Sequence, residues 1–146
     1  MIKLVSIIIP VFNEVDAIEK LVENTQNLRN LGLNFEYEII IVDDGSTDGT
    51  GSTLKEIQLT NENLHVVSLA RNYGQSTALQ AGFDNCTGDV LITMDGDLQN
   101  DPTDIPKIID ILKDNNEIDL VAGWRKDRQD ATLTRKLPSI FANYLI

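Results

Sequence analysis

Short apolar runs alternate with helical patterns along most of the chain, and this alternation constrains its fold more than any other feature. The runs begin at Leu4, Glu36, Leu64, Val90 and Asp119, and the stretches between them repeat apolar residues at three- and four-residue steps. Strands that alternate with helices are typical of a parallel sheet with right-handed crossovers. The sequence therefore predicts an α/β fold with a mostly parallel sheet and helices on both faces.

Residues that start or stop regular structure set the expected boundaries. We expect strands over 4–12, 36–42, 64–69, 90–94 and 119–123, and helices over 16–31, about 47–59, 75–85 and roughly 104–114. Pro10 should end the first strand, Gly32 should stop the first helix, and Ser46 or Thr47 should cap the second. Small residues in the 75–85 helix indicate close packing on the sheet. The residues expected to face inward there are Ala78, Leu79, Ala81, Gly82 and Phe83.

The composition favours one globular domain. The chain has 146 residues, of which 42% are hydrophobic, and this suits a single core rather than disorder. Cys86 is the only cysteine, so no internal disulfide can form. His65 is the only histidine, which excludes a metal site built from several histidines.

The charge is acidic overall but unevenly distributed. The net charge is −11, from 12 basic and 23 acidic residues, which argues against nucleic acid as a partner. Residues 124–146 nevertheless hold five basic and two acidic residues, with apolar residues at helical spacing. This segment is interpreted either as an ordinary core helix or as a basic amphipathic helix at an anionic membrane surface.

No stretch approaches the roughly 18 apolar residues of a membrane-spanning helix. The apolar run at the N-terminus is too short for a signal peptide and lacks a cleavage-like segment, so it is interpreted as the first core strand. We therefore expect a cytoplasmic protein, or one at the cytoplasmic face of the membrane.

A polar cluster follows every predicted strand. The clusters cover residues 10–14, 43–48, 71–75, 95–99 and 124–130. The carboxyl ends of parallel strands lie along one edge of the sheet, and ligands of open α/β sheets bind at that edge. Five polar clusters on one edge therefore predict a binding site there.

The cluster Asp95-Gly96-Asp97-Leu98-Gln99 has the clearest chemistry. Gly96 would let the backbone turn sharply and come close to a ligand. Asp95, Asp97 and the Gln99 amide oxygen offer hard oxygen atoms, which suit Mg²⁺ or Mn²⁺ when a substrate phosphate supplies further ligands. A solvated acidic turn is the other interpretation of the same residues.

Five motifs occur in the order seen in family 2 glycosyltransferases, which the chain resembles from residue 4 to about residue 137. They are Ile8-Ile9-Pro10-Val11-Phe12-Asn13-Glu14, Val42-Asp43-Asp44-Gly45-Ser46-Thr47-Asp48, Ala70-Arg71-Asn72-Tyr73-Gly74, Asp95-Gly96-Asp97-Leu98-Gln99 and Gly123-Trp124-Arg125. The resemblance implies a GT-A nucleotide-sugar-binding domain over residues 1–146 and, more narrowly, the polyprenyl-phosphate sugar synthase branch. It implies inverting, metal-assisted transfer of a sugar from a nucleoside-diphosphate sugar to a polyprenyl phosphate, with residues 124–146 near the membrane.

The resemblance also implies roles for single residues. Those that match nucleotide or sugar contacts are Pro10, Phe12, Asn13, Glu14, Val42, Asp43, Asp44, Arg71, Asp95 and Gly96. Asp97 and Gln99 match metal ligands beside the diphosphate. Asp97, Arg125 and Arg128 match catalytic positions, the two arginines near the donor or acceptor phosphate.

Two departures from the family pattern and two rival functions stay open at this point. The chain stops before the end of such a catalytic domain, so we expect a fragment, and Asn100-Asp101-Pro102 changes the spacing after Gln99. A phosphoacceptor signalling domain would use Asp43, Asp44 and Asp95, although its acid pair should follow the first strand rather than the second. A nucleotide-binding module without turnover is the other alternative.

Overall fold

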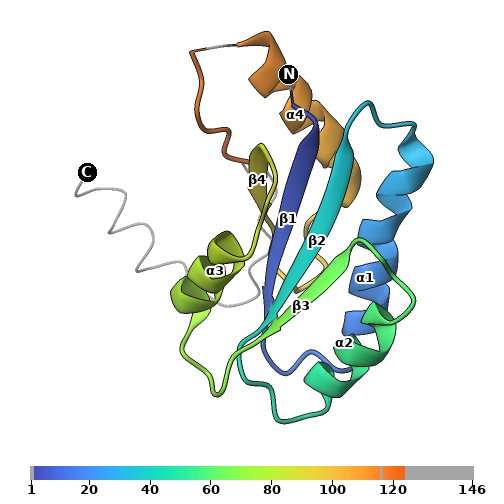
Figure 1. The fold of residues 1–146 in the computed structure, drawn as a ribbon, viewed down its shortest axis with the longest axis vertical. Helices are drawn as coiled ribbons and strands as arrows, with labels where there is room; N and C mark the ends of the chain where they lie inside the picture. The colour runs from blue at the N-terminus through green and yellow to red at the C-terminus, as the bar shows by residue number, and fades with distance from the viewer. Residues whose placement is uncertain (1, 116, 124–146) are drawn as a thin grey trace, which may run out of the picture.

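The structure, a computed structural model, describes residues 2–115 and 117–123. Within them, four strands form one parallel sheet in the order β3-β2-β1-β4 (Figure 1). The strands are β1 (Leu4–Val11), β2 (Glu36–Asp43), β3 (Leu64–Ser68) and β4 (Val90–Thr93). β1 pairs with both β2 and β4, so its end at Pro10 and Val11 reaches the middle of the sheet's carboxyl edge.

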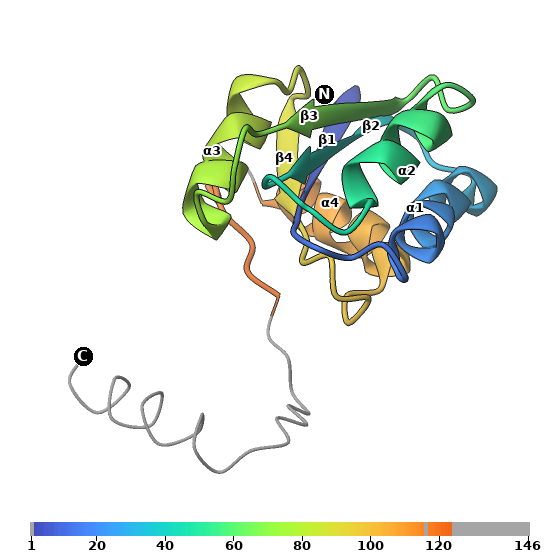
Figure 2. The same cartoon turned by 90° about the horizontal axis from the view of Figure 1, so that it is seen from below.

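Helices cover both faces of the sheet, as the alternation of patterns predicts. They are α1 (Ile18–Gln26), α2 (Thr50–Gln58), α3 (Gln75–Asp84) and α4 (Ile105–Asp114), with 3-10 turns η1 (Asn27–Leu31) and η2 (Pro102–Asp104). α1, α2 and α4 lie on one face and α3 on the other (Figure 2). The predicted 16–31 helix tightens into η1 and stops at Gly32, whose φ is 62°. No helix in the described ranges is both long and apolar enough to cross a membrane.

The strands divide the core into two layers by simple alternation. Ile7 and Ile9 of β1 face the layer under α1, α2 and α4, whereas Ile8 faces the layer under α3. The central positions of β1 and β2 are fully buried on both faces, which explains their continuous apolar runs.

The predicted close packing of α3 rests on Gly82. A Cβ atom built on Gly82 would lie 2.3 Å from Cγ2 of Ile8, so only a residue without a side chain lets the helix come this close to β1. Ala78, one turn earlier, is also fully buried. The prediction that Phe83 faces inward is wrong, because its side chain is 38% exposed at the side of the helix.

The predicted strand over residues 119–123 is not formed. Within the described residues β4 pairs only with β1, and residues 118–123 face β4 across a cavity of about 890 Å³. Leu120 is 81% exposed. An apolar run becomes a strand only where a neighbouring backbone takes up its hydrogen bonds, and within the described residues β4 does not pair with this run.

The predicted cap of α2 by Ser46 or Thr47 is also wrong. The helix begins after Gly49, which has a φ of 106° and makes no side-chain capping bond. The Ser46 hydroxyl accepts the backbone N–H of Asn13 at 2.9 Å, and the Thr47 N–H donates to Oδ1 of Asn13 at 2.9 Å. Both residues therefore join two loops instead of starting a helix.

A buried polar cluster joins the strands at the end of the sheet opposite these loops. Glu38 Oε1 accepts the Ser6 hydroxyl at 2.6 Å and the Thr87 N–H at 2.7 Å, and Glu38 Oε2 lies 3.8 Å from Nε2 of His65. Burial alone would raise the pKa of Glu38, but the hydrogen bonds from Ser6 and Thr87 outweigh it and lower this pKa. The cluster connects β1, β2, β3 and the segment before β4.

Candidate nucleotide-binding site

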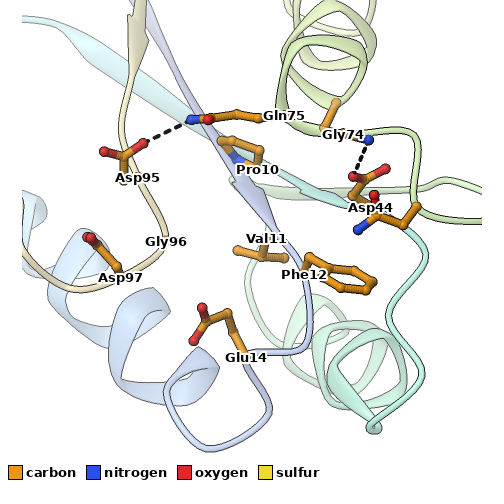
Figure 3. Close-up of a pocket in the computed structure, with 12 residues that line it drawn as sticks. Pro10, Val11, Phe12, Glu14, Asp44, Gly74, Gln75, Asp95, Gly96 and Asp97 are labelled. Carbon is orange, nitrogen blue, oxygen red and sulfur yellow. Dashed lines mark hydrogen bonds between the residues drawn. The ribbon is translucent and has the colours of Figure 1, made fainter. Parts of the chain in front are cut away.

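A cavity of about 280 Å³ opens at the carboxyl edge of the sheet, between the ends of β1, β2 and β4 and the start of α3 (Figure 3). Residues from four polar segments far apart in the sequence meet around it. The sequence-predicted site residues that line it are Pro10, Phe12, Glu14, Asp44, Asp95, Gly96 and Asp97. The cavity is therefore built where the order of the strands brings the loops together.

Asp44 fixes one wall of this cavity. It is 4% exposed, and its two carboxylate oxygens accept the backbone N–H groups of Tyr73 at 2.8 Å and Gly74 at 2.9 Å. Gly45, next to it, has a φ of 70°, and a Cβ atom there would lie 2.3 Å from the backbone of Arg71. The loops after β2 and β3 are thus held in direct contact.

Asn13, Asp43 and Val42 are three of the four predicted nucleotide contacts that lie outside the lining, and the fourth is Arg71. Asn13 has a φ of 54° and uses its side chain to hold Thr47. Asp43 is buried, and its Oδ1 accepts the Ser46 N–H at 2.9 Å. Val42 is fully buried and packs under α3. These three residues lie behind the lining. Asn13 and Asp43 hold the loops around the cavity through hydrogen bonds, and Val42 packs in the core.

The turn after β4 forms the opposite wall. Asp95 and Asp97 are exposed at the rim, while Gly96 between them is buried against β1. A Cβ atom on Gly96 would lie 2.8 Å from Cγ1 of Val11, so glycine lets this turn press on the strand. Leu98 adopts a φ of 61° and packs against the core, which anchors the turn despite an uncommon backbone conformation.

Gln99, predicted as a metal ligand, is not among the lining residues. Its backbone N–H donates to Oδ1 of Asp97 at 3.0 Å. Gln99 therefore helps to orient the Asp97 carboxylate through its backbone. Arg71 also lies outside the lining, with its guanidinium over the ring of Tyr73 at 4.9 Å from the centroid. Arg125 and Arg128 fall outside the described residues.

The cavity is strongly acidic. Glu14, Asp44, Asp95 and Asp97 line it, and none of its described lining residues is a lysine or an arginine. A carboxylate and a phosphate oxygen 4 Å apart repel each other by about 4 kcal/mol at an effective dielectric constant of 20. An anionic ligand would therefore need a cation between itself and these side chains.

The donor set suits a hard divalent cation that is shared with a ligand. Carboxylate oxygens are the atoms that Mg²⁺ and Mn²⁺ prefer. Among residues 2–115 and 117–123, no group of three or more acidic, histidine or cysteine side chains is arranged as a ready-made metal site. Mg²⁺ is usually bound by one or two carboxylates, with water and substrate phosphate completing its shell.

A smaller cavity of about 160 Å³ adjoins the first. The two share Pro10, Gln75 and Asp95. The side-chain amide of Gln75 donates to Oδ1 of Asp95 at 3.2 Å, and Figure 3 shows the Gln75 side chain running beside Pro10 towards Asp95. The bond therefore lies at the boundary between the two cavities.

The cavity of about 280 Å³ has further lining residues to which sequence reasoning assigned no role in the site, namely Val11, Asn72, Gly74, Gln75 and Ala78. Three of them belong to the start of α3 or the loop before it, within the predicted 71–75 cluster. A helix that begins at the carboxyl edge of a sheet directs its first turn at the site. That rule could have identified Gly74 and Gln75, whereas nothing in the sequence distinguishes Val11 or Ala78 from other core residues.

Similar proteins agree with this architecture. A dodecaprenyl-phosphate galacturonate synthase of Rhizobium johnstonii is 45% identical over 142 residues, which are 97% of this chain and 41% of that protein. A Pyrobaculum calidifontis mannosyltransferase, solved with GDP-Man and Mn²⁺, is 25% identical with a TM-score of 0.63, over 74% of this chain and 32% of that one. The glucosyl-3-phosphoglycerate synthase of Mycobacterium tuberculosis, solved with Mn²⁺, UDP and glucosyl-3-phosphoglycerate, is 25% identical with a TM-score of 0.66. That match covers 98% of this chain and 52% of that one.

The chain thus has a GT-A-like α/β fold, and two solved proteins that share it contain Mn²⁺. The family model described as "Glycosyl transferase family 2" matches residues 6–145. The phosphoacceptor alternative has no support from this match. With nearly its whole length matched, the chain belongs to glycosyl transferase family 2.

Proposed function

We propose that this chain is the donor-binding part of a glycosyltransferase that moves a sugar from a nucleoside-diphosphate sugar to a polyprenyl phosphate, with inversion at the anomeric carbon. The observation that carries the donor class is the acidic cavity at the carboxyl edge of the sheet. The acceptor class rests on the similarity to the galacturonate synthase, of which the chain spans 41% of the length.

Different lining residues would bind the two ends of the donor, the nucleobase and the diphosphate. Phe12 is 42% exposed at the rim and offers an apolar surface for a nucleobase. Asp44 keeps the loop before α3 in place beside it, and Asp95 and Gly96 lie where a ribose would follow. Asp97 and Asp95 then face the diphosphate.

A divalent cation at Asp97, when bound, would neutralise the diphosphate and stabilise the leaving nucleoside diphosphate as its charge grows. Mg²⁺ and Mn²⁺ both suit these oxygens. Arg125 and Arg128 can bind a phosphate through planar guanidinium groups, and we assign them to the donor or acceptor phosphate. An acceptor that is already an anionic phosphate needs no strong general base, so the chain need not supply one.

We place the protein in the cytoplasm or at the cytoplasmic face of the membrane, because its acceptor would be a lipid. The basic residues of the 124–146 segment suit an anionic lipid surface. A nucleotide-binding module without turnover is the second candidate, since the lining residues to which we assign a role all serve the donor and its cation.

The test is a thermal-shift screen of nucleoside diphosphates with Mn²⁺. A matching nucleotide should raise the melting temperature of the wild type, because a ligand that binds only the folded state stabilises it. Asp97→Asn should abolish the shift, whereas Asp110→Asn, an exposed carboxylate on α4, should leave it unchanged. The proposal fails if no nucleotide shifts the wild type in the presence of Mn²⁺.

A further inference from the structure

Gln75 lines the proposed donor-binding cavity, but the proposed function assigns it no role. It is the first residue of α3, it lines both adjoining cavities, and its amide donates to Asp95 Oδ1 at 3.2 Å. It is thus the side chain that connects the wall made by the β3–α3 loop with the wall made by the turn after β4 (Figure 3).

The start of α3 is a fixed support for this contact. The buried Asp44 holds the N–H groups of Tyr73 and Gly74, the two residues directly before Gln75. The helix itself is held down on β1 through Gly82. Gln75 therefore reaches Asp95 from a rigid base, whereas Asp95 belongs to an exposed turn.

The chemistry of the contact leaves the charge of Asp95 intact. A carboxamide N–H is a neutral donor, so it fixes the direction of the Asp95 carboxylate without cancelling its negative charge. A lysine in the same place would also donate, but its positive charge would oppose a cation bound nearby.

We propose that Gln75 is a positioning residue whose amide holds Asp95 at the cavity rim, and with it the Asp95–Asp97 turn, in the orientation that binds the divalent cation of a nucleoside diphosphate. This inference rests on the proposed donor-binding function. It assigns to Gln75 no contact with the nucleotide itself.

The experiment compares wild type with Gln75→Ala and Gln75→Lys. Mn²⁺ binding is followed by electron paramagnetic resonance, with Mn²⁺ alone and in the presence of UDP or GDP, and UDP and GDP affinities are measured by calorimetry with and without Mn²⁺. The melting temperature of each unligated variant shows whether the fold is intact.

Gln75→Ala should weaken Mn²⁺-dependent nucleotide binding about three- to tenfold, the effect expected for losing one hydrogen bond near the surface. Gln75→Lys should weaken it further, and the additional loss should shrink as salt is added, because it arises from charge. Neither variant should lower the unligated melting temperature, since the bond lies at an exposed rim.

Gln80→Ala is the matched control. Gln80 lies on the same helix and its side-chain amide donates to Asp84 Oδ1 at 2.8 Å. The variant therefore loses an equivalent hydrogen bond between residues that line neither cavity. Its Mn²⁺ and nucleotide affinities should equal those of the wild type.

The outcomes separate the two proposals. If the wild type binds none of the nucleoside diphosphates of the thermal-shift screen with Mn²⁺, both the donor-binding function and the role of Gln75 are overturned. If the wild type binds but Gln75→Ala binds equally well, only the role of Gln75 is overturned. If Gln75→Lys binds Mn²⁺ and nucleotide as tightly as the wild type, any hydrogen-bond donor suffices at this position. That result would overturn the requirement for a neutral donor.

Discussion

Asp44 acts on the backbone of the protein as much as on any ligand. Both of its oxygens accept N–H groups from the loop before α3, and the side chain is almost completely buried. Removing such an acceptor leaves two part-buried donors without their protein partner, and a hydrogen bond to a charged group contributes about 1.5–3 kcal/mol.

Asp44→Ala should therefore lower the free energy of unfolding by about 2–4 kcal/mol, measured by urea denaturation. Asp104→Ala is the comparison, because Asp104 makes only an exposed ion pair with Lys107 at 2.7 Å and should unfold like the wild type. Equal stability of the two variants would contradict a structural role for Asp44.

At the scale of single residues, the sequence predicts which polar positions gather but not how each side chain is used. Asp43 and Asp44 are neighbours in one motif, yet Asp43 turns towards Ser46 while Asp44 turns towards the cavity and the loop after β3. Adjacent residues at the end of a strand point to opposite sides, and which side faces the site depends on the neighbouring strands. Gln75 was missed for a similar reason, since its partner Asp95 is 20 residues away.

At the scale of elements, α3 shows how closely a helix can approach a sheet. At position 82 the glycine lacks the Cβ atom, which would lie 2.3 Å from Cγ2 of Ile8. The helix thereby brings its first turn to the rim of the cavity. Intrinsic propensity favours alanine over glycine in a helix by about 1 kcal/mol, so the glycine is retained against that preference by packing.

Gly82→Ala should destabilise the protein by about 1–3 kcal/mol, because the added methyl group forces α3 away from β1. The measurement is chemical denaturation, with Ser76→Ala as the control. Ser76 is exposed on the same helix, and its replacement should leave stability unchanged or slightly higher. A stabilised Gly82→Ala protein would show that the packing can relax.

Strands were predictable where an apolar run pairs with at least one neighbouring strand. The strands β1 to β4 each lie within about a residue of their expected ranges, because each apolar run pairs with a neighbouring strand, and those of β1 and β2 are also buried on both faces. Residues 119–123 have the same kind of run but no adjacent strand in the described part of the chain. The predicted cap of α2 was wrong because Ser46 and Thr47 form hydrogen bonds with Asn13 instead. No local motif reveals this tertiary contact.

At the scale of the whole molecule, the Glu38 cluster makes stability depend on pH. The folded pKa of Glu38 lies below its ordinary value of 4.5, because hydrogen bonds from Ser6 and Thr87 outweigh burial. A depressed carboxylate pKa stabilises the folded state above the unfolded pKa, and this contribution is lost as pH falls through the folded pKa.

The free energy of unfolding should therefore fall as pH is lowered below about 4.5. Glu38→Gln should make this acid-side decline shallower, as measured by denaturation at a series of pH values between 3 and 6. Glu36→Gln, an exposed carboxyl on the same strand, is the control and should keep the slope of the wild type. An unchanged slope in Glu38→Gln would contradict the role of the cluster.

The position of β1 between β2 and β4 has a consequence for the order in which the protein matures. The end of β1 and the turn after β4 both line the cavity, and they meet only once β4 has been added beside β1. Pairings between segments so distant along the chain form slowly. During synthesis on the ribosome, a growing polypeptide therefore cannot complete this cavity before the codons for Asp95 to Asp97 have been translated and that stretch has left the exit tunnel.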